Sequence, residues 1–101
     1  MVVRIWRTQV HEERQLAYEA FARERSLPMF REQPGFLGVL FAKSPEGCAV
    51  ITLWRSLDDV QRLDQSPTYN ETVAAITDAG LLDGPSSVEV FETHGHELSL
   101  S

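Results

Sequence analysis

Arg4 and Trp6 are the first residues whose types and spacing suggest chemistry. They lie two positions apart in a stretch with a strand-like period, so both side chains share one face of a strand. If that face meets helices, a guanidinium and an indole enter a ligand pocket, where Arg4 would stabilise a phenolate or enolate. If it meets a partner sheet, Arg4 would form an interface ion pair. Alternation fixes only the relative facing, so both interpretations stay open.

Tyr69 and Asn70 form a second candidate pair. They follow Ser66-Pro67, a typical helix start, and one of the two is expected to face inward. A phenol and an amide are suited to orienting a carbonyl or phenol substrate by hydrogen bonds. The alternative is a tyrosine held on the surface with its hydroxyl in water.

Trp54 stands near the end of an apolar strand segment, and it can stack on an aromatic ligand or seal the junction between sheet and helix. Thr52 lies on the same strand segment and is the last candidate for the ligand site. We therefore predict Trp54, Tyr69 and Asn70 as catalytic residues and Arg4, Trp6 and Thr52 as ligand-binding residues.

No metal site or cofactor is predicted. His94 and His96 lie two apart near Glu92, a spacing that suits a metal, but it is more typical of a polar tail. His11 at a helix start is expected to be solvated. Cys48 is the single cysteine, which excludes an intramolecular disulfide and a cysteine-ligated cluster, and a buried thiol is the usual case.

Composition excludes several classes of protein. The 101 residues carry a formal charge of −6, which argues against binding a nucleic acid backbone. No apolar run approaches the ~20 residues that a membrane span needs. The arginines near the start argue against a signal peptide. We expect a soluble protein of the cytoplasm, with one domain over residues 1–101, a core over about 2–94 and a loose tail over 95–101.

Proline, glycine and serine residues mark the boundaries between six predicted strands and helices. The alternating segments predict strands, and the segments with helical spacing predict helices. Pro28 is expected to interrupt the first helix, with Ser26 capping a short continuation. Leu16, Ala17, Ala20 and Phe21 are predicted to form its apolar stripe. The order is strand 2–9, helix 10–32, strand 36–43, strand 48–55, helix 57–79 and strand 88–93. This β-α-β-β-α-β pattern predicts the α+β ferredoxin-like fold, an antiparallel sheet with helices on one face.

The central strands are apolar on both faces, although helices cover only one. We expect Phe36 and Leu40 to point one way and Leu37, Val39 and Phe41 to point the other. The uncovered face therefore keeps large apolar side chains, which usually marks an interface. The simplest partner is a second copy packed sheet against sheet, and the sequence predicts a homodimer.

The chain resembles the antibiotic biosynthesis monooxygenase family of dimeric α/β barrels. The resemblance runs from about Val3 to His94. The segments that carry it are Leu27-Pro28, Gln33 to Gly38, Ala49 to Ser56 and Gly80 to Pro85. It implies a pocket between helices and sheet, and cofactor-free oxygenation of phenolic polyketides, oxidation of quinols or degradation of haem.

Only part of the family's functional set is present. Trp54 matches the strand-end tryptophan of the polyketide oxygenases. At the positions of their asparagine, tyrosine and arginine, this chain has Val50 or Thr52, Val60 and about Val73. Thr68 stands where quinol-oxidising relatives carry a histidine, and the second helix lacks a histidine for haem. Two functions stay open: an oxygenase of a small aromatic, polyketide or quinol metabolite, and a non-catalytic small-ligand-binding homodimer.

Overall fold

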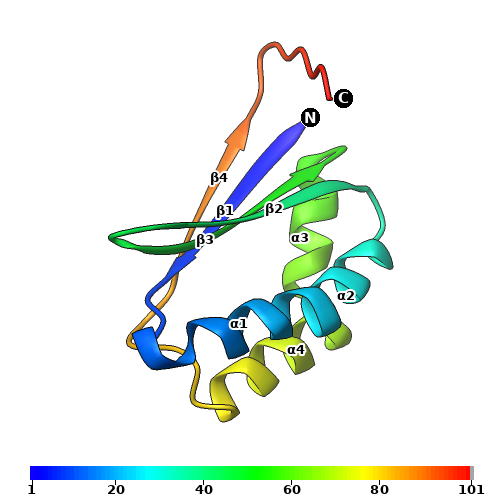
Figure 1. The fold of residues 1–101 in the computed structure, drawn as a ribbon. Helices are drawn as coiled ribbons and strands as arrows, with labels where there is room; N and C mark the ends of the chain where they lie inside the picture. Colours follow the sequence, from blue (N-terminus) through cyan, green and yellow to red (C-terminus); the bar gives the residue numbers. More distant parts are fainter. Residues whose placement is uncertain (101) are drawn as a thin grey trace.

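The protein is built on one antiparallel sheet of four strands, seen in a computed structural model that describes residues 1–100 (Figure 1). The strand order is β2-β3-β1-β4, which places the first and third strands in the centre. The strands are β1 (Val2–Thr8), β2 (Phe36–Ser44), β3 (Gly47–Trp54) and β4 (Ser87–Glu92). The predicted ferredoxin-like α+β order is confirmed.

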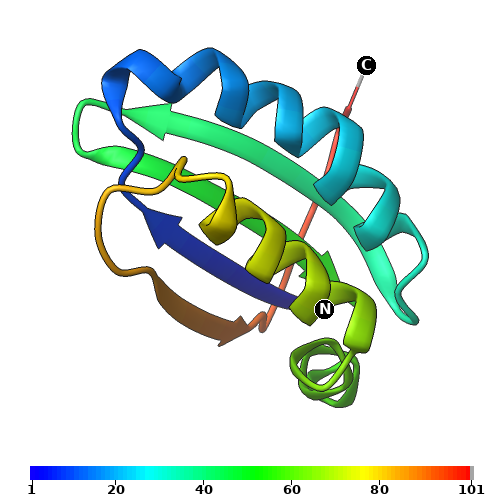
Figure 2. The ribbon, with the colours of Figure 1, turned by 90° about the horizontal axis from the view of Figure 1, so that it is seen from below.

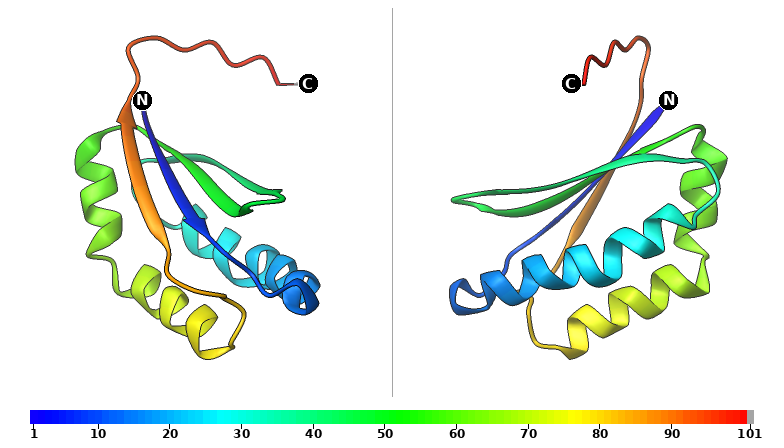
Figure 3. Two further views of the ribbon diagram at one scale, coloured as in Figure 1. Left: turned by 90° about the vertical axis from the view of Figure 1, so that its left-hand side faces the viewer. Right: turned by 45° about the vertical axis from the view of Figure 1, so that its right-hand side comes forward.

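The helices lie on one side of the sheet and leave the other side uncovered (Figures 1 and 3). The first helical region passes from η1 (Glu12–Arg14) through α1 (Gln15–Phe21) and η2 (Ala22–Ser26) to α2 (Leu27–Arg31). The second consists of α3 (Leu57–Asp64) and α4 (Pro67–Asp78). Seen from below, the first region and α4 lie side by side under the sheet (Figure 2). Residues 95–100 form no helix or strand, and residue 101 of the predicted tail lies outside the described residues.

The first helical region does not break at Pro28, contrary to the sequence prediction. A π-helical turn over Ala22–Ser26 precedes the proline and widens the helix where the proline ring lies over the preceding turn. Ser26 has helical backbone angles and makes no capping hydrogen bond, so it is not a helix cap. Its side chain lines a cavity instead.

The inward face of this region also differs from the predicted stripe. Leu16 is 82% exposed and Ala17 is exposed, whereas Tyr18 and Ala22 are buried. The helix is therefore rotated so that the phenol of Tyr18, and not the smaller side chain of Leu16, packs toward the sheet. Phe21 is the one member of the predicted stripe that packs against the core.

Because of a β-bulge, the side chains of β2 do not face the sides of the sheet that the sequence predicted. Phe36 pairs with Trp54, but Gly38, two residues later, pairs with Leu53, so the register shifts by one residue between them. The extra residue reverses the alternation. Phe36, Val39 and Phe41 consequently all pack against the helix-side core. Leu40 points to the uncovered side with 60% exposure.

Serine side chains cap the starts of both helices of the second helical region, including the start predicted at Ser66-Pro67. The Ser56 hydroxyl accepts a hydrogen bond from the Asp59 amide and donates one to the Asp59 carboxylate. Ser66 accepts from the Tyr69 amide, with Pro67 at the first helical position. These caps satisfy amides that helix starts leave free, and they set the direction from which α4 crosses the sheet.

The helix-side core divides into two clusters, with Trp6 packed against both. One gathers around Trp54 and Phe30, and the other around Tyr18 and Ile76. The uncovered side of the sheet is apolar at its centre, with the Arg7–Glu89 ion pair near one end. Among its apolar members are Val3, Ile5, Leu40, Ile51, Leu53 and Phe91. Within residues 1–100, no helix is long and apolar enough to cross a membrane.

Gly35 and Gly80 provide a matched test of the fold, because both have positive φ, 78° and 69°. A Cβ at Gly80 meets open space, whereas one at Gly35 would lie 2.1 Å from the Asp59 carboxylate. We expect Gly80→Ala to lower the free energy of unfolding by about 1 kcal/mol, the cost of a left-handed alanine. Gly35→Ala should cost about 2 kcal/mol more, because the capping carboxylate must move.

Urea denaturation of both variants measures the difference. Equal losses for Gly35→Ala and Gly80→Ala would show that the contact between the Gly35 turn and Asp59 does not constrain the fold.

Candidate functional site

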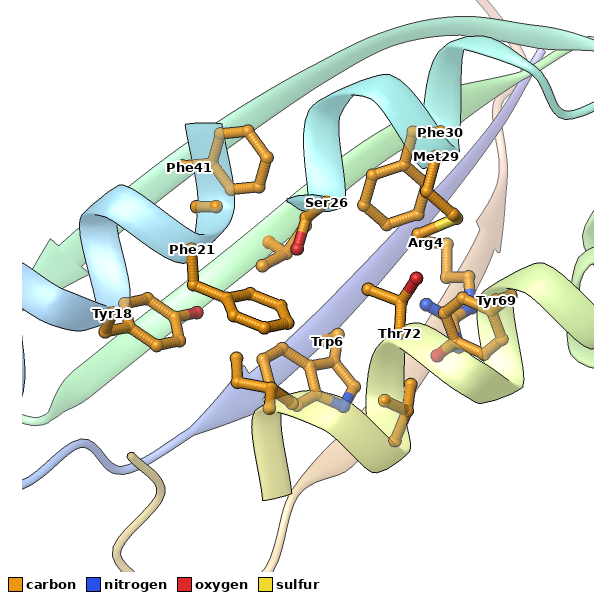
Figure 4. A pocket seen from close by; sticks show the side chains of 14 residues that line it. Arg4, Trp6, Tyr18, Phe21, Ser26, Met29, Phe30, Phe41, Tyr69 and Thr72 are labelled. Atoms are coloured by element: carbon orange, nitrogen blue, oxygen red, sulfur yellow. Dashed lines mark hydrogen bonds between the residues drawn. The ribbon is translucent and has the colours of Figure 1, made fainter. Parts of the chain in front are cut away.

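A cavity lies between the sheet and the two helical regions (Figure 4). Its volume is about 40 Å³, which is room for little more than water without side-chain movement. Strand β1 supplies Arg4 and Trp6, which settles the open question of their facing: both point toward the helices. The other lining side chains are Tyr18, Phe21, Ala22, Ser26, Met29, Phe30, Phe41, Val50, Tyr69, Thr72, Val73 and Ile76.

Arg4 is the cation of this cavity and is only 3% exposed. Its Nη2 donates to the Tyr69 hydroxyl at 2.8 Å and lies 3.4 Å from Oδ1 of Asp64. The guanidinium carbon lies 5.2 Å from the centre of the Tyr69 ring, a cation–π distance. Two partners and an aromatic face therefore compensate for burying the charge.

The Nε atom of Arg4 has no such compensation. Within residues 1–100 it is the single buried side-chain nitrogen or oxygen without a hydrogen-bond partner. A buried donor without an acceptor costs about 1–3 kcal/mol. A ligand oxygen bound in this part of the cavity, with a small shift of the neighbouring rings, would supply the missing acceptor.

Tyr69 is oriented by the same contact. A guanidinium only donates, so the Tyr69 oxygen accepts from Arg4 and keeps its own proton for a third group. Asn70 does not share this position: it is exposed and lies outside the cavity lining. Successive residues of a helix point about 100° apart, so only one of the predicted pair faces the cavity. The placement argues against a catalytic role for Asn70 within a single chain.

Trp54 and Thr52 lie behind the cavity wall and do not line it. Both are completely buried. The Trp54 indole donates to the Thr52 hydroxyl at 2.8 Å, and that hydroxyl donates to the Arg4 carbonyl at 3.4 Å. Trp54 also packs edge-on against Phe30 and Phe36. Their polar groups are thus committed to one another and hold the strand that carries Arg4.

Tyr18 is a lining residue that the sequence prediction missed. Its side chain is 5% exposed, and it lines the cavity from α1. Burial raises the pKa of its phenol above the ordinary value of 10.0, and the negative charge of an ionised Cys48 would raise it further. The signal available in the sequence was the spacing of Tyr18, Phe21 and Ala22, an alternative helical face.

The remaining candidates lie apart from the cavity. His94 and His96 are exposed residues that follow β4. His11 lies 3.8 Å from the Asp83 carboxylate at the surface. Cys48 is a buried free thiol with Gln15 as its polar neighbour at 3.8 Å. Over residues 1–100, no three histidine, cysteine or acidic side chains are grouped closely enough to hold a metal ion.

Comparison with known families gives one match. The model of the antibiotic biosynthesis monooxygenase family matches residues 1–75, and the chain belongs to this family. No curated protein gives a significant match to this sequence.

Many solved structures share the fold. The monooxygenase ActVA-Orf6 of Streptomyces coelicolor, solved in complex with nanaomycin D, has a TM-score of 0.77 and 23% identity over 98% of this chain and 92% of that one. SnoaB, a cofactor-independent oxygenase of Streptomyces nogalater, has a TM-score of 0.72 and 21% identity over 94% of each chain. Rv0793 of Mycobacterium tuberculosis has a TM-score of 0.73 and 22% identity over 94% and 96%. At these identities the likeness establishes the fold.

The raised pKa of Tyr18 predicts a loss of stability at high pH. The folded chain holds the phenol proton more tightly than the unfolded chain does. Stability from this group is therefore complete below pH 10 and falls as the pH rises above it. The slope approaches about 1.4 kcal/mol per pH unit.

Urea denaturation of wild type and Tyr18→Phe at pH 8 and at pH 11 measures this effect. We expect the variant to lose about 1 kcal/mol less than wild type between the two values, since phenylalanine has no proton to lose. An equal loss in both proteins would show that Tyr18 titrates as it does in the unfolded chain.

Proposed function

We propose that this protein oxygenates a small aromatic phenol or quinol held in the cavity, without a bound cofactor. The observation that carries the proposal is the hydrogen bond between buried Arg4 and half-buried Tyr69 beside an apolar, aromatic lining. Arg4 favours the phenolate over the phenol, and the Tyr69 proton is free to bind the substrate oxygen. The apolar walls keep water away from the reacting carbon.

The substrate would supply the electrons for this reaction. Loss of the phenol proton to solvent gives an electron-rich ring that reduces O₂. For an anthrone-type CH₂ group, one oxygen atom becomes the new carbonyl and the other leaves in water, so the substrate gives up four electrons and two hydrogens. The protein then contributes orientation and charge stabilisation rather than a redox group.

The family membership supports this kind of chemistry, and SnoaB is itself described as a cofactor-independent oxygenase. The alternative function is binding without catalysis. One observation favours it: Val73, the approximate position of the family's arginine, lines the cavity with an apolar side chain. We place the protein in the cytoplasm, a proposal supported by its single free and buried thiol.

Oxygen uptake distinguishes catalysis from binding alone. With anthrone, hydroxynaphthacene and naphthohydroquinone compounds in air, we expect uptake above the uncatalysed rate with at least one of them. Tyr69→Phe should lower kcat/KM roughly a hundredfold, the cost of removing one positioned donor. The control is Glu71→Gln on the exposed side of α4, which should leave the rate unchanged.

Binding of these compounds without any uptake would reject the oxygenase in favour of the binding protein. Unchanged turnover in Tyr69→Phe would reject the assignment of the Arg4–Tyr69 pair.

The active unit in this proposal is a homodimer packed through the uncovered side of the sheet. The apolar side chains of that side support it, because leaving them in water is costly: Leu40 and Phe91 on the outer strands are exposed, and Ile51 on the central strand β3 is half-buried. We expect a solution mass of twice 11.4 kDa at micromolar concentration. Ile51→Glu should give a monomer, since a charge cannot be buried there without a partner.

Light scattering coupled to size exclusion measures the mass. Leu16→Glu is the matched control, because Leu16 is an exposed leucine on α1, away from the sheet. A wild-type mass near 11.4 kDa would contradict the dimer.

A further inference from the structure

The cavity carries polar groups at two opposite ends. Arg4 and Tyr69 lie at one end, and the Tyr18 hydroxyl lies at the other, directed toward the aromatic side chains between them (Figure 4). The two phenols belong to different parts of the core: Tyr69 packs against the Trp54 cluster and Tyr18 belongs to the Ile76 cluster. Trp6 packs against both clusters and spans the distance between them.

The hydroxyl of Tyr18 contributes no hydrogen bond to the folded chain. The side chain is almost completely buried, and its hydroxyl makes no hydrogen bond to the rest of residues 1–100. The oxygen itself is not fully buried, because Arg4 Nε is the one fully buried polar side-chain atom of residues 1–100 without a partner. The hydroxyl faces the cavity, where an oxygen atom of a ligand would be its partner.

Tyr18 is also suited to donate. Because burial raises the pKa of its phenol, the group keeps its proton at any physiological pH. At the other end, Arg4 presents a charge and an unpaired Nε. The two ends therefore differ: one favours an ionised oxygen, and the other favours a neutral oxygen that accepts a hydrogen bond.

The side chains between the two ends would have to move to admit a ring, because the cavity holds only about 40 Å³, but their chemistry suits an aromatic one. Aromatic side chains line the cavity, and Ser26 on the π-helical turn adds a hydroxyl along its length. Aromatic walls favour stacked or edge-on aromatic ligands. A ligand of one or two rings requires less movement of these side chains than a larger fused system does.

From this geometry we infer that Tyr18 is a specificity-determining residue, which recognises a second oxygen at the far end of an aromatic substrate whose first oxygen meets Arg4 and Tyr69. The inference rests on the proposed function, since it assumes that the cavity binds a phenol. It defines the substrate class more narrowly: aromatic compounds with oxygens on opposite sides of a ring, of which 1,4-dihydroxynaphthalene is the simplest two-ring example.

Two ligands that differ by one hydroxyl test the inference. 1,4-Dihydroxynaphthalene and 1-naphthol have the same ring system, and isothermal titration calorimetry without oxygen gives the Kd of each. We expect wild type to bind the dihydroxy compound roughly tenfold more tightly, the value of one hydrogen bond to a buried donor. Tyr18→Phe should remove this preference and leave the Kd of 1-naphthol unchanged.

Tyr69→Phe is the matched control at the other end of the cavity. It should weaken both ligands by a similar factor, because both carry the hydroxyl that meets Arg4. Equal affinities in wild type, or a preference that survives in Tyr18→Phe, would overturn the role of Tyr18 while the phenol site stands. Failure of both ligands to bind wild type would overturn the proposed function and this inference with it.

Discussion

The burial of the Arg4 guanidinium beneath the helices is the constraint on which the rest of the site depends. A cation in an apolar cavity is expensive unless other groups compensate for its lost hydration. Here Tyr69 supplies an acceptor and an aromatic face, and Asp64 supplies a carboxylate from the end of α3. The caps that start α3 and α4 therefore matter for chemistry, since they place both partners beside the strand.

Strand β1 carries Arg4 on one face and side chains of the proposed dimer interface on the other. Arg4 and Trp6 face the helices, and their neighbours Val3 and Ile5 face the uncovered side. The same strand thus supplies the cavity and the proposed dimer interface. Burying the uncovered side would stiffen the strand that carries Arg4, so assembly and ligand binding are physically linked in this account.

Element order was predictable because it rests on local signals. The alternation of β1 and the helix start at Ser66-Pro67 depend on residues close in sequence, and both are found in the structure. The shared facing of Arg4 and Trp6 was predictable for the same reason. Which way that face turned depends on packing between distant segments, and alternation alone leaves it open.

The errors have equally specific causes. The bulge between Phe36 and Gly38 adds one residue to β2 and reverses the predicted facing beyond it. The π-helical turn let the first helix continue through Pro28, and the face bearing Tyr18 was missed because Leu16 is more hydrophobic. Trp54 and Thr52 were selected by residue type, which does not say that they lie behind the cavity lining with a hydrogen bond between them, and their functional role stays a prediction.

The ionisation of a phenol bound in the cavity tests the central claim most directly. Burial alone raises the pKa of a phenol, whereas the charge of Arg4 lowers it, so the two effects differ in sign. Titration of bound 1-naphthol by its absorbance gives that pKa on the wild-type protein. The account predicts a value below that of 1-naphthol in water. A value equal to or above the value in water would contradict it, since Arg4 would then not act on the oxygen of the ligand.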